Sequence, residues 1–149
     1  MIKIIQGDIL EAKEDIRAHQ TNSVGIMGSG LAQQIKKIYP EAYEDYKKFC
    51  LSNTDVFGRT LISECKDGKY IAHLFGQYSY GTSKRHTNYD MLERALNILF
   101  YKSEVMNKNV AIPYNIGCCR GGGDWSVVYQ IIERVFGEND VSIYRLDKG

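Results

Sequence analysis

The sequence has 149 residues, of which 44% are hydrophobic and 25% are charged, as in ordinary globular proteins. This length is typical of one domain with its own core, and we expect a single domain over residues 1–149. The formal net charge of +1 gives no electrostatic basis for binding nucleic acid or an anionic membrane, although a local pocket can still bind a small anion.

Membrane spans, secretion signals and metal sites are not indicated. No apolar run approaches the roughly 18 residues of a membrane span, and the N-terminal MIKIIQGDIL lacks the layout of a signal peptide. The cysteines Cys50, Cys65, Cys118 and Cys119 form no CxxC pair and suit a reducing compartment. The histidines stand at no metal-ligand spacing from them, and no acidic cluster suits magnesium. We therefore expect a cytoplasmic monomer without a metal or cofactor.

Short apolar runs and helical patterns alternate along the chain. Strands are predicted at residues 2–6, 16–22, 59–64, 70–75, 109–114 and 141–146, and helices at 30–39, 40–50, 91–100 and 124–136. Pro40 suits the first turn of its helix, and Thr87 with Asp90 resembles a capping box before the helix at 91–100. Short, nearly all-apolar strands separated by helices indicate an α/β fold with helices on both faces of the sheet.

Two glycine-rich loops, residues 22–30 and 115–123, each lie between a predicted strand and a predicted helix. In such sheets ligands bind where strand ends pass into loops. Glycines leave backbone amides uncovered, and amides that precede a helix form an anion site together with the helix dipole. Either loop alone is equally consistent with a plain flexible turn. The pairing of the two favours a phosphate-binding cleft.

The common phosphate-binding motifs do not fit these loops. Gly123 stands where a Walker sequence has its lysine, and the GxGxxG pattern over residues 28–33 fails at its last position. A thiol phosphatase needs an arginine six residues after its cysteine, and neither Cys118 nor Cys119 has one there.

Four segments follow one another along nearly the whole chain. They are GDIL at 7–10, AHQTNSVGIMGSGLAQQI at 18–35, FGQYSYG with TNYDML between 75 and 92, and IPYNIGCCRGGGDW at 112–125. Together they resemble the macrodomain family of ADP-ribose binders, especially the branch of the yeast-type ADP-ribose 1″-phosphate phosphatase and the terminal ADP-ribose protein glycohydrolase. The resemblance implies a three-layer α/β/α fold with a mixed central sheet and a pocket for ADP-ribose or a derivative.

The same resemblance implies which residues bind the ligand. Asp8 would accept a hydrogen bond from the adenine amino group, with Tyr144 and Leu146 as a wall for the ring. The loop at 25–31 would wrap the distal ribose and one phosphate, Asn22 would reach a ribose hydroxyl, and the second loop would give amides to the pyrophosphate. The implied binding residues are Asp8, Ile9, Asn22, Gly28, Ser29, Gly30, Leu31, Ile116, Gly117, Cys118, Cys119, Arg120, Gly121, Gly122, Gly123 and Leu146.

The resemblance to the phosphatase branch implies His19 and Asp124 as a catalytic pair. Asp124 would align or deprotonate the attacking water, and His19 would donate a proton or a hydrogen bond to the leaving sugar oxygen or steady the phosphate. Structural roles compete with these: Asp124 and Asp8 both suit helix N-caps, and His19 suits a hydrogen-bonded place in the core. For the two adjacent cysteines, a nucleophilic role competes with that of small apolar fillers, and spacing shows no basic partner.

Two differences from the glycohydrolase branch help to choose between the candidate reactions. The glycohydrolase branch has a lysine where this chain has Gln77, and an aspartate that aligns near Gly121. We therefore expect binding of ADP-ribose and hydrolysis of ADP-ribose 1″-phosphate to ADP-ribose and phosphate. The alternatives are a non-catalytic ADP-ribose reader and a hydrolase that removes ADP-ribose from a protein or a nucleic-acid end.

Overall fold

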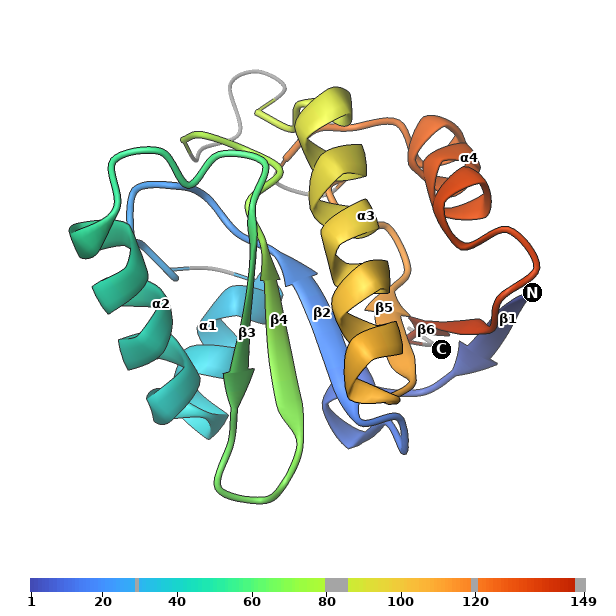
Figure 1. The fold of residues 1–149 in the computed structure, drawn as a ribbon, viewed down its shortest axis with the longest axis horizontal. Coiled ribbons are helices and arrows are strands. Elements are labelled where there is room, and N and C mark those ends of the chain that lie inside the picture. Colours follow the sequence, from blue (N-terminus) through green and yellow to red (C-terminus); the bar gives the residue numbers. More distant parts are fainter. Residues whose placement is uncertain (29, 80–85, 119–120, 147–149) are drawn as a thin grey trace.

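Six strands form one sheet in the order β1–β6–β5–β2–β4–β3 (Figure 1). The computed structural model describes residues 1–28, 30–79, 86–118 and 121–146. The strands are β1 (Ile2–Gln6), β2 (Ile16–Gln20), β3 (Thr60–Glu64), β4 (Tyr70–Leu74), β5 (Val110–Pro113) and β6 (Val141–Arg145). All neighbouring pairs are parallel except β3 with β4, which is antiparallel, so the sheet is mixed as expected.

Helices cover both faces of this sheet and complete the three layers (Figure 1). They are α1 (Gly30–Ile38), α2 (Pro40–Ser52), α3 (Tyr89–Met106) and α4 (Trp125–Phe136), with a short 3₁₀ turn, η1, at Ile9–Glu11. Helices α3 and α4 pack on one face, where they bury apolar side chains of β2, β4, β5 and β6. Helices α1 and α2 pack with η1 on the other face.

The alternation of side chains along β2 shows how one strand serves both layers. Ile16 and Ala18 are buried in the core under α3 and α4, whereas Arg17 and His19, one residue further along in each case, face the other layer. Arg17 there donates to Leu10 O and Ala12 O, and so holds the turn that follows β1. The first four residues of β2 alternate between apolar and polar side chains, and all four are buried because both faces of the strand are covered.

All six predicted strands and all four predicted helices are confirmed, with differences at their ends. The predicted capping box before α3 is wrong. Asn88 is the N-cap, and its Oδ1 accepts from Met91 N at 3.1 Å. The Thr87 hydroxyl instead donates to Gly117 O at 2.6 Å, so it ties two loops together.

The parallel strands place their carboxyl ends along one edge of the sheet. Loops that leave β2, β4 and β5 meet there, and the loops that leave β1 and β6 continue the same edge, because Gln6 pairs with Arg145. The fold therefore brings the two glycine-rich loops side by side.

Candidate ligand-binding cleft

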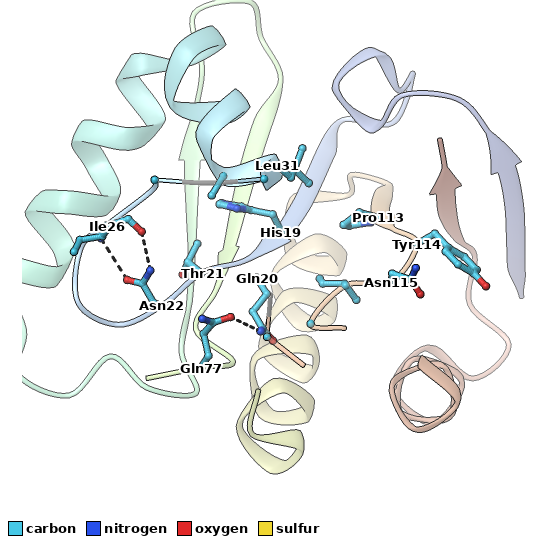
Figure 2. Close-up of a pocket in the computed structure, with 16 residues that line it drawn as sticks. His19, Gln20, Thr21, Asn22, Ile26, Leu31, Gln77, Pro113, Tyr114 and Asn115 are labelled. Atoms are coloured by element: carbon cyan, nitrogen blue, oxygen red, sulfur yellow. Dashed lines mark hydrogen bonds between the residues drawn. The ribbon is translucent and has the colours of Figure 1, made fainter. Parts of the chain in front are cut away.

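A cavity of about 470 Å³ opens at this edge, between the loops that follow β2, β4 and β5 (Figure 2). Both glycine-rich loops and the beginning of α1 contribute to its wall. The lining residues are His19, Gln20, Thr21, Asn22, Ile26, Gly28, Gly30, Leu31, Ala32, Gln77, Pro113, Tyr114, Asn115, Ile116, Gly117 and Gly121. The predicted convergence of the two loops is therefore what the structure shows.

Asn22 organises the first loop. Its Nδ2 donates to Ile26 O at 2.7 Å, and its Oδ1 accepts from Val24 N at 3.1 Å and from Ile26 N at 3.3 Å. Tyr46, a fully buried residue of α2, donates to both Asn22 O and Asn22 Oδ1. The amide predicted to reach a ribose hydroxyl is thus largely occupied with shaping the loop (Figure 2).

The second loop folds tightly on the carbonyl of Gly117. This oxygen accepts from Gly123 N at 2.9 Å and from Thr87 Oγ1 at 2.6 Å. A Cβ at Gly123 would lie 2.8 Å from that oxygen, and one at Gly121 would lie 2.7 Å from it. Gly122 lies between them with φ +74°, which favours glycine. The three consecutive glycines are therefore required by packing and backbone conformation.

The loop retains part of the predicted set of free amides. The amide of Ile116 donates to Pro113 O at the end of β5, and the amides of Cys118 and Gly123 donate to carbonyls within the loop. In the described part of the chain, the amides of Gly117 and Gly121 have no protein acceptor, and both residues line the cavity. At the opposite wall lie Gly30, Leu31 and Ala32, in the first turn of α1, where backbone N–H groups lack intrahelical partners. The two walls together can bind an anion.

Helix α4 does not provide this anion site. Asp124 is its N-cap, and Oδ1 accepts from Ser126 N and Ser126 Oγ, both at 2.9 Å. The carboxylate thereby occupies the beginning of the helix. These hydrogen bonds show the structural role of Asp124. The residue is exposed and lies outside the cavity lining, and its catalytic role stays a prediction.

A network of neutral side chains closes the cleft beside β4. Gln20 Nε2 donates to Gln77 Oε1 at 2.7 Å and to Thr87 Oγ1 at 2.9 Å, and Gln77 Nε2 donates to Ser79 O at 2.6 Å. Gln20 Oε1 is buried without a partner among the described residues. Gln77 thus places an amide in the cleft at the position where the glycohydrolase branch has a lysine.

His19 lines the cleft but is only 2% exposed. Its Nε2 lies 2.9 Å from Nδ1 of His73, its register partner on β4. Burial lowers the pKa of His19 to about 3, so the imidazole is neutral at physiological pH. The ring of His19 therefore carries one proton, and which of the two histidines donates in their hydrogen bond depends on the tautomer.

The residues predicted to bind adenine lie outside the cavity lining, along the same sheet edge. Asp8 caps η1 by accepting from Leu10 N at 2.9 Å, and Ile9 is buried beneath that turn. Gly7 N donates to Arg145 O at 3.0 Å, which places Asp8 close to the end of β6 and the exposed Leu146. The Tyr144 hydroxyl donates to buried Glu14 at 2.6 Å, so its polar end is directed into the protein.

The predicted site residues therefore divide into three groups. Those that line the cavity are His19, Asn22, Gly28, Gly30, Leu31, Ile116, Gly117 and Gly121. Those outside its lining are Asp8, Ile9, Cys118, Gly122, Gly123, Asp124 and Leu146. Ser29, Cys119 and Arg120 lie outside the described residues.

Sequence reasoning missed several lining residues at strand ends. Tyr114 and Asn115 directly follow β5, and Thr21 directly follows β2. Tyr114 is backed by Trp125 at a ring-centroid distance of 4.6 Å, and the Arg145 guanidinium lies 4.6 Å from its ring centroid. Asn115 has φ +67°, a left-handed conformation rare for residues other than glycine. An asparagine at the junction of a strand and a glycine-rich loop was the available signal.

Among the described residues, no group of three or more metal-ligating side chains occurs. The described helices are also too short or too polar to cross a membrane.

The Macro domain family matches residues 18–132, which include both glycine-rich loops. The chain belongs to this family. The DNA ADP-ribosyl glycohydrolase of Thermus aquaticus is 29% identical over 140 residues, which cover 89% of this chain and 37% of that protein. The ADP-ribose 1″-phosphate phosphatase of Lodderomyces elongisporus is 24% identical over 159 residues, which cover 98% of this chain and 99% of that enzyme. The chain thus spans well under half of the length of the Thermus aquaticus protein.

Solved structures agree with this assignment. The macrodomain of Mycobacterium tuberculosis DarG superposes with a TM-score of 0.84 at 28% identity, covering 97% of each chain. Thermosipho africanus DarTG in complex with ADP-ribose superposes with a TM-score of 0.82 at 21% identity, covering 99% of this macrodomain and 42% of that chain. This chain therefore shares its fold with a part of a protein whose structure was solved in complex with ADP-ribose.

Proposed function

We propose that this macrodomain binds the ADP-ribose group in its cleft and hydrolyses ADP-ribose 1″-phosphate to ADP-ribose and phosphate. The observation that carries the proposal is the meeting of the two glycine-rich loops around one cavity of about 470 Å³. The amides of Gly117 and Gly121, which have no acceptor among the described residues, and the first turn of α1 supply donors for a diphosphate from two sides. Both groups of relatives, phosphatase and glycohydrolase, are named for reactions of ADP-ribose derivatives.

The remaining contacts follow the edge of the sheet. We propose that adenine lies toward Asp8 and Leu146, at the ends of β1 and β6, with the diphosphate between α1 and Gly117. The distal ribose then lies in the part of the cleft that His19 and Gln77 line. Gln77 supports the phosphatase over lysine-dependent glycosidic cleavage, because its amide carries neither charge nor a transferable proton near neutral pH.

In the proposed reaction, water attacks phosphorus and the bond from phosphorus to the 1″ oxygen breaks. One proton of the attacking water ends on the 1″ oxygen, and the other stays with the phosphate. Asp124 remains the proposed base. Its Oδ1 is engaged by Ser126, whereas Oδ2 has no protein partner in the described part of the chain. For the base to act, the substrate phosphate must extend beyond the cavity lining toward the beginning of α4.

A second candidate is removal of ADP-ribose from DNA. Identities of 29% and 28% to DNA ADP-ribosyl glycohydrolases exceed the 24% to the full-length phosphatase, which favours this reaction despite the glutamine at residue 77. We also propose a cytoplasmic location, because the four cysteines form no CxxC pair and suit a reducing compartment. We further propose a monomer, and sedimentation analysis under reducing conditions tests the oligomeric state.

Three parallel measurements test these assignments. Phosphate release from ADP-ribose 1″-phosphate and release of ADP-ribose from an ADP-ribosylated DNA oligonucleotide are assayed, and ADP-ribose binding is measured by calorimetry. Phosphate release that is lost in Asp124→Asn but retained in Asp55→Asn, an exposed aspartate outside the cleft, supports the phosphatase. Cleavage of the oligonucleotide alone supports the second candidate. Binding without either reaction makes the protein a reader, and absence of binding refutes the proposal.

A further inference from the structure

A buried hydrogen-bonded chain leads from the cleft to the surface of α2. His19 Nε2 lies 2.9 Å from His73 Nδ1, His73 Nε2 lies 3.0 Å from Ser63 Oγ, and Ser63 Oγ donates to Asp45 Oδ2 at 2.7 Å. His19, His73 and Ser63 are at most 2% exposed, whereas Asp45 is an exposed residue of α2. Four elements, β2, β4, β3 and α2, thus contribute one residue each.

The carboxylate end determines the direction of every hydrogen bond in this chain. A carboxylate accepts only, so the single hydroxyl proton of Ser63 is given to Asp45. The Ser63 oxygen must then accept from Nε2–H of His73. A neutral imidazole has one N–H, so Nδ1 of His73 accepts from Nε2–H of His19. Nδ1 of His19 is left with a lone pair and no proton.

The surroundings support neutral rings for both histidines. Burial lowers the pKa of His19 to about 3 and holds the pKa of His73 well below its ordinary value, with a further contribution from His19. Tyr46 stacks on His73 with ring centroids 5.6 Å apart. Among the described residues, no carboxylate forms an ion pair with either imidazole. The hydrogen-bonded series of side chains therefore runs through uncharged groups from the cleft to Asp45.

The cleft end of the chain lacks a partner. His19 Nδ1 is buried, and no group among the described residues donates to it, although His19 lines the cavity. A buried acceptor without a donor is unfavourable, so a ligand that supplies the donor gains affinity there. A phosphate oxygen, which carries no proton at neutral pH, is repelled by the same lone pair.

We infer that Asp45, Ser63 and His73 hold His19 in the tautomer that presents an unprotonated Nδ1 to the cleft, where it accepts a hydrogen bond from a hydroxyl group of the bound sugar. The identity of the sugar rests on the proposed function. His19 is in this assignment a binding residue that selects a hydroxyl over a phosphate oxygen, and the other three are positioning residues. The role differs from the proton donation expected from the sequence.

Nitrogen-15 NMR of the imidazole rings in the free protein tests the tautomer without any ligand. In the wild type at neutral pH, Nε2 of both histidines is expected to be protonated and Nδ1 unprotonated. In Asp45→Asn the amide can donate to Ser63, so the opposite tautomer of His19 becomes populated. The control Glu44→Gln changes a neighbouring exposed carboxylate of α2 and leaves the spectrum unchanged. A protonated Nδ1 in the wild type, or a wild-type spectrum from Asp45→Asn, overturns the inference.

Calorimetry with ADP-ribose and with analogues that each lack one distal-ribose hydroxyl tests the ligand side. One analogue is expected to bind about tenfold more weakly or worse, since it leaves the buried acceptor unpaired. The difference in affinity between ADP-ribose and this analogue should become smaller in Asp45→Asn and should remain in Glu44→Gln. Equal binding of all analogues overturns the hydroxyl assignment. A protein that binds none of these ligands refutes the proposed function, while the NMR spectrum still decides the tautomer.

Discussion

Replacing Gly121 by alanine should push the second glycine-rich loop away from Thr87 and the end of β2. The new Cβ would overlap Thr87 Oγ1 and lie 2.7 Å from Gly117 O and 3.0 Å from Gln20 Nε2. Gly121 does not have a positive φ, so the cost is steric and not conformational. The Gly117 carbonyl would be pushed away from its two donors, Thr87 Oγ1 and Gly123 N. Overpacking costs about 1–3 kcal/mol, and each lost hydrogen bond about 0.5–1.5 kcal/mol.

We expect Gly121→Ala to lower the free energy of unfolding by about 2–4 kcal/mol, measured by urea denaturation. The matched control is Gly28→Ala in the opposite loop, whose Cβ would meet only Ile26 Cγ2 at an ordinary 3.7 Å. Its stability should stay within about 1 kcal/mol of the wild type. Equal stabilities of the two variants would show that the second loop can open without cost, and would refute the reasoning.

Three other substitutions or conditions probe separate parts of the structure. Asp124→Ala should lose about 0.5–2 kcal/mol of unfolding free energy by removing the N-cap of α4, whereas Asp124→Asn should retain it; equal urea midpoints would contradict capping. Glu14→Gln should lose about 1–3 kcal/mol in the same assay, because Ser142 and Tyr144 donate to different oxygens of Glu14 and the NH2 group that replaces one of these oxygens cannot accept. His19 and His73 have folded-state pKa values below the unfolded value of about 6.5, so their contribution to stability is present above that pH and is lost below it, by up to about 2.7 kcal/mol per pH unit. A urea midpoint that does not decrease when the pH is lowered from 7 to 5 would show that the rings become protonated in the folded state.

The strand order illustrates what the sequence could not predict. Apolar runs identify β1 and β6 separately, but their pairing joins the two ends of the chain, and β1 with β6 has no local signal. The edge of the sheet on which the loops meet follows from parallel strands, which the alternation of strands and helices does indicate. The existence of the cleft and a large part of its lining were therefore predictable, whereas the lining residues Thr21, Tyr114 and Asn115 were not predicted.

Side-chain roles were harder to predict than backbone roles, because each depends on a partner far away in the sequence. His19 and His73 are 54 residues apart and meet through strand register, so the direction of their hydrogen bond cannot be read from either segment. Thr87 matches a capping pattern, but Gly117, 30 residues further on, accepts its hydroxyl proton instead. Local patterns compete with such tertiary partners, and here the tertiary partners prevail.

The neutral network beside β4 involves both positions, Gln77 and Gly121, at which the sequence resemblance implies a departure from the glycohydrolase branch. Gly121 has no room for any side chain while Thr87 and Gln20 occupy their present positions, so an aspartate at this point requires both to move. Gln20 in turn donates to Gln77, the residue that stands in place of the lysine. A single lysine or aspartate introduced into this chain would break the network without completing a catalytic pair. Introducing the lysine and the aspartate therefore requires Thr87 and Gln20 to move as well as the replacement of Gln77 and Gly121, because Gln20 donates to both Gln77 and Thr87 and both Gln20 and Thr87 crowd Gly121.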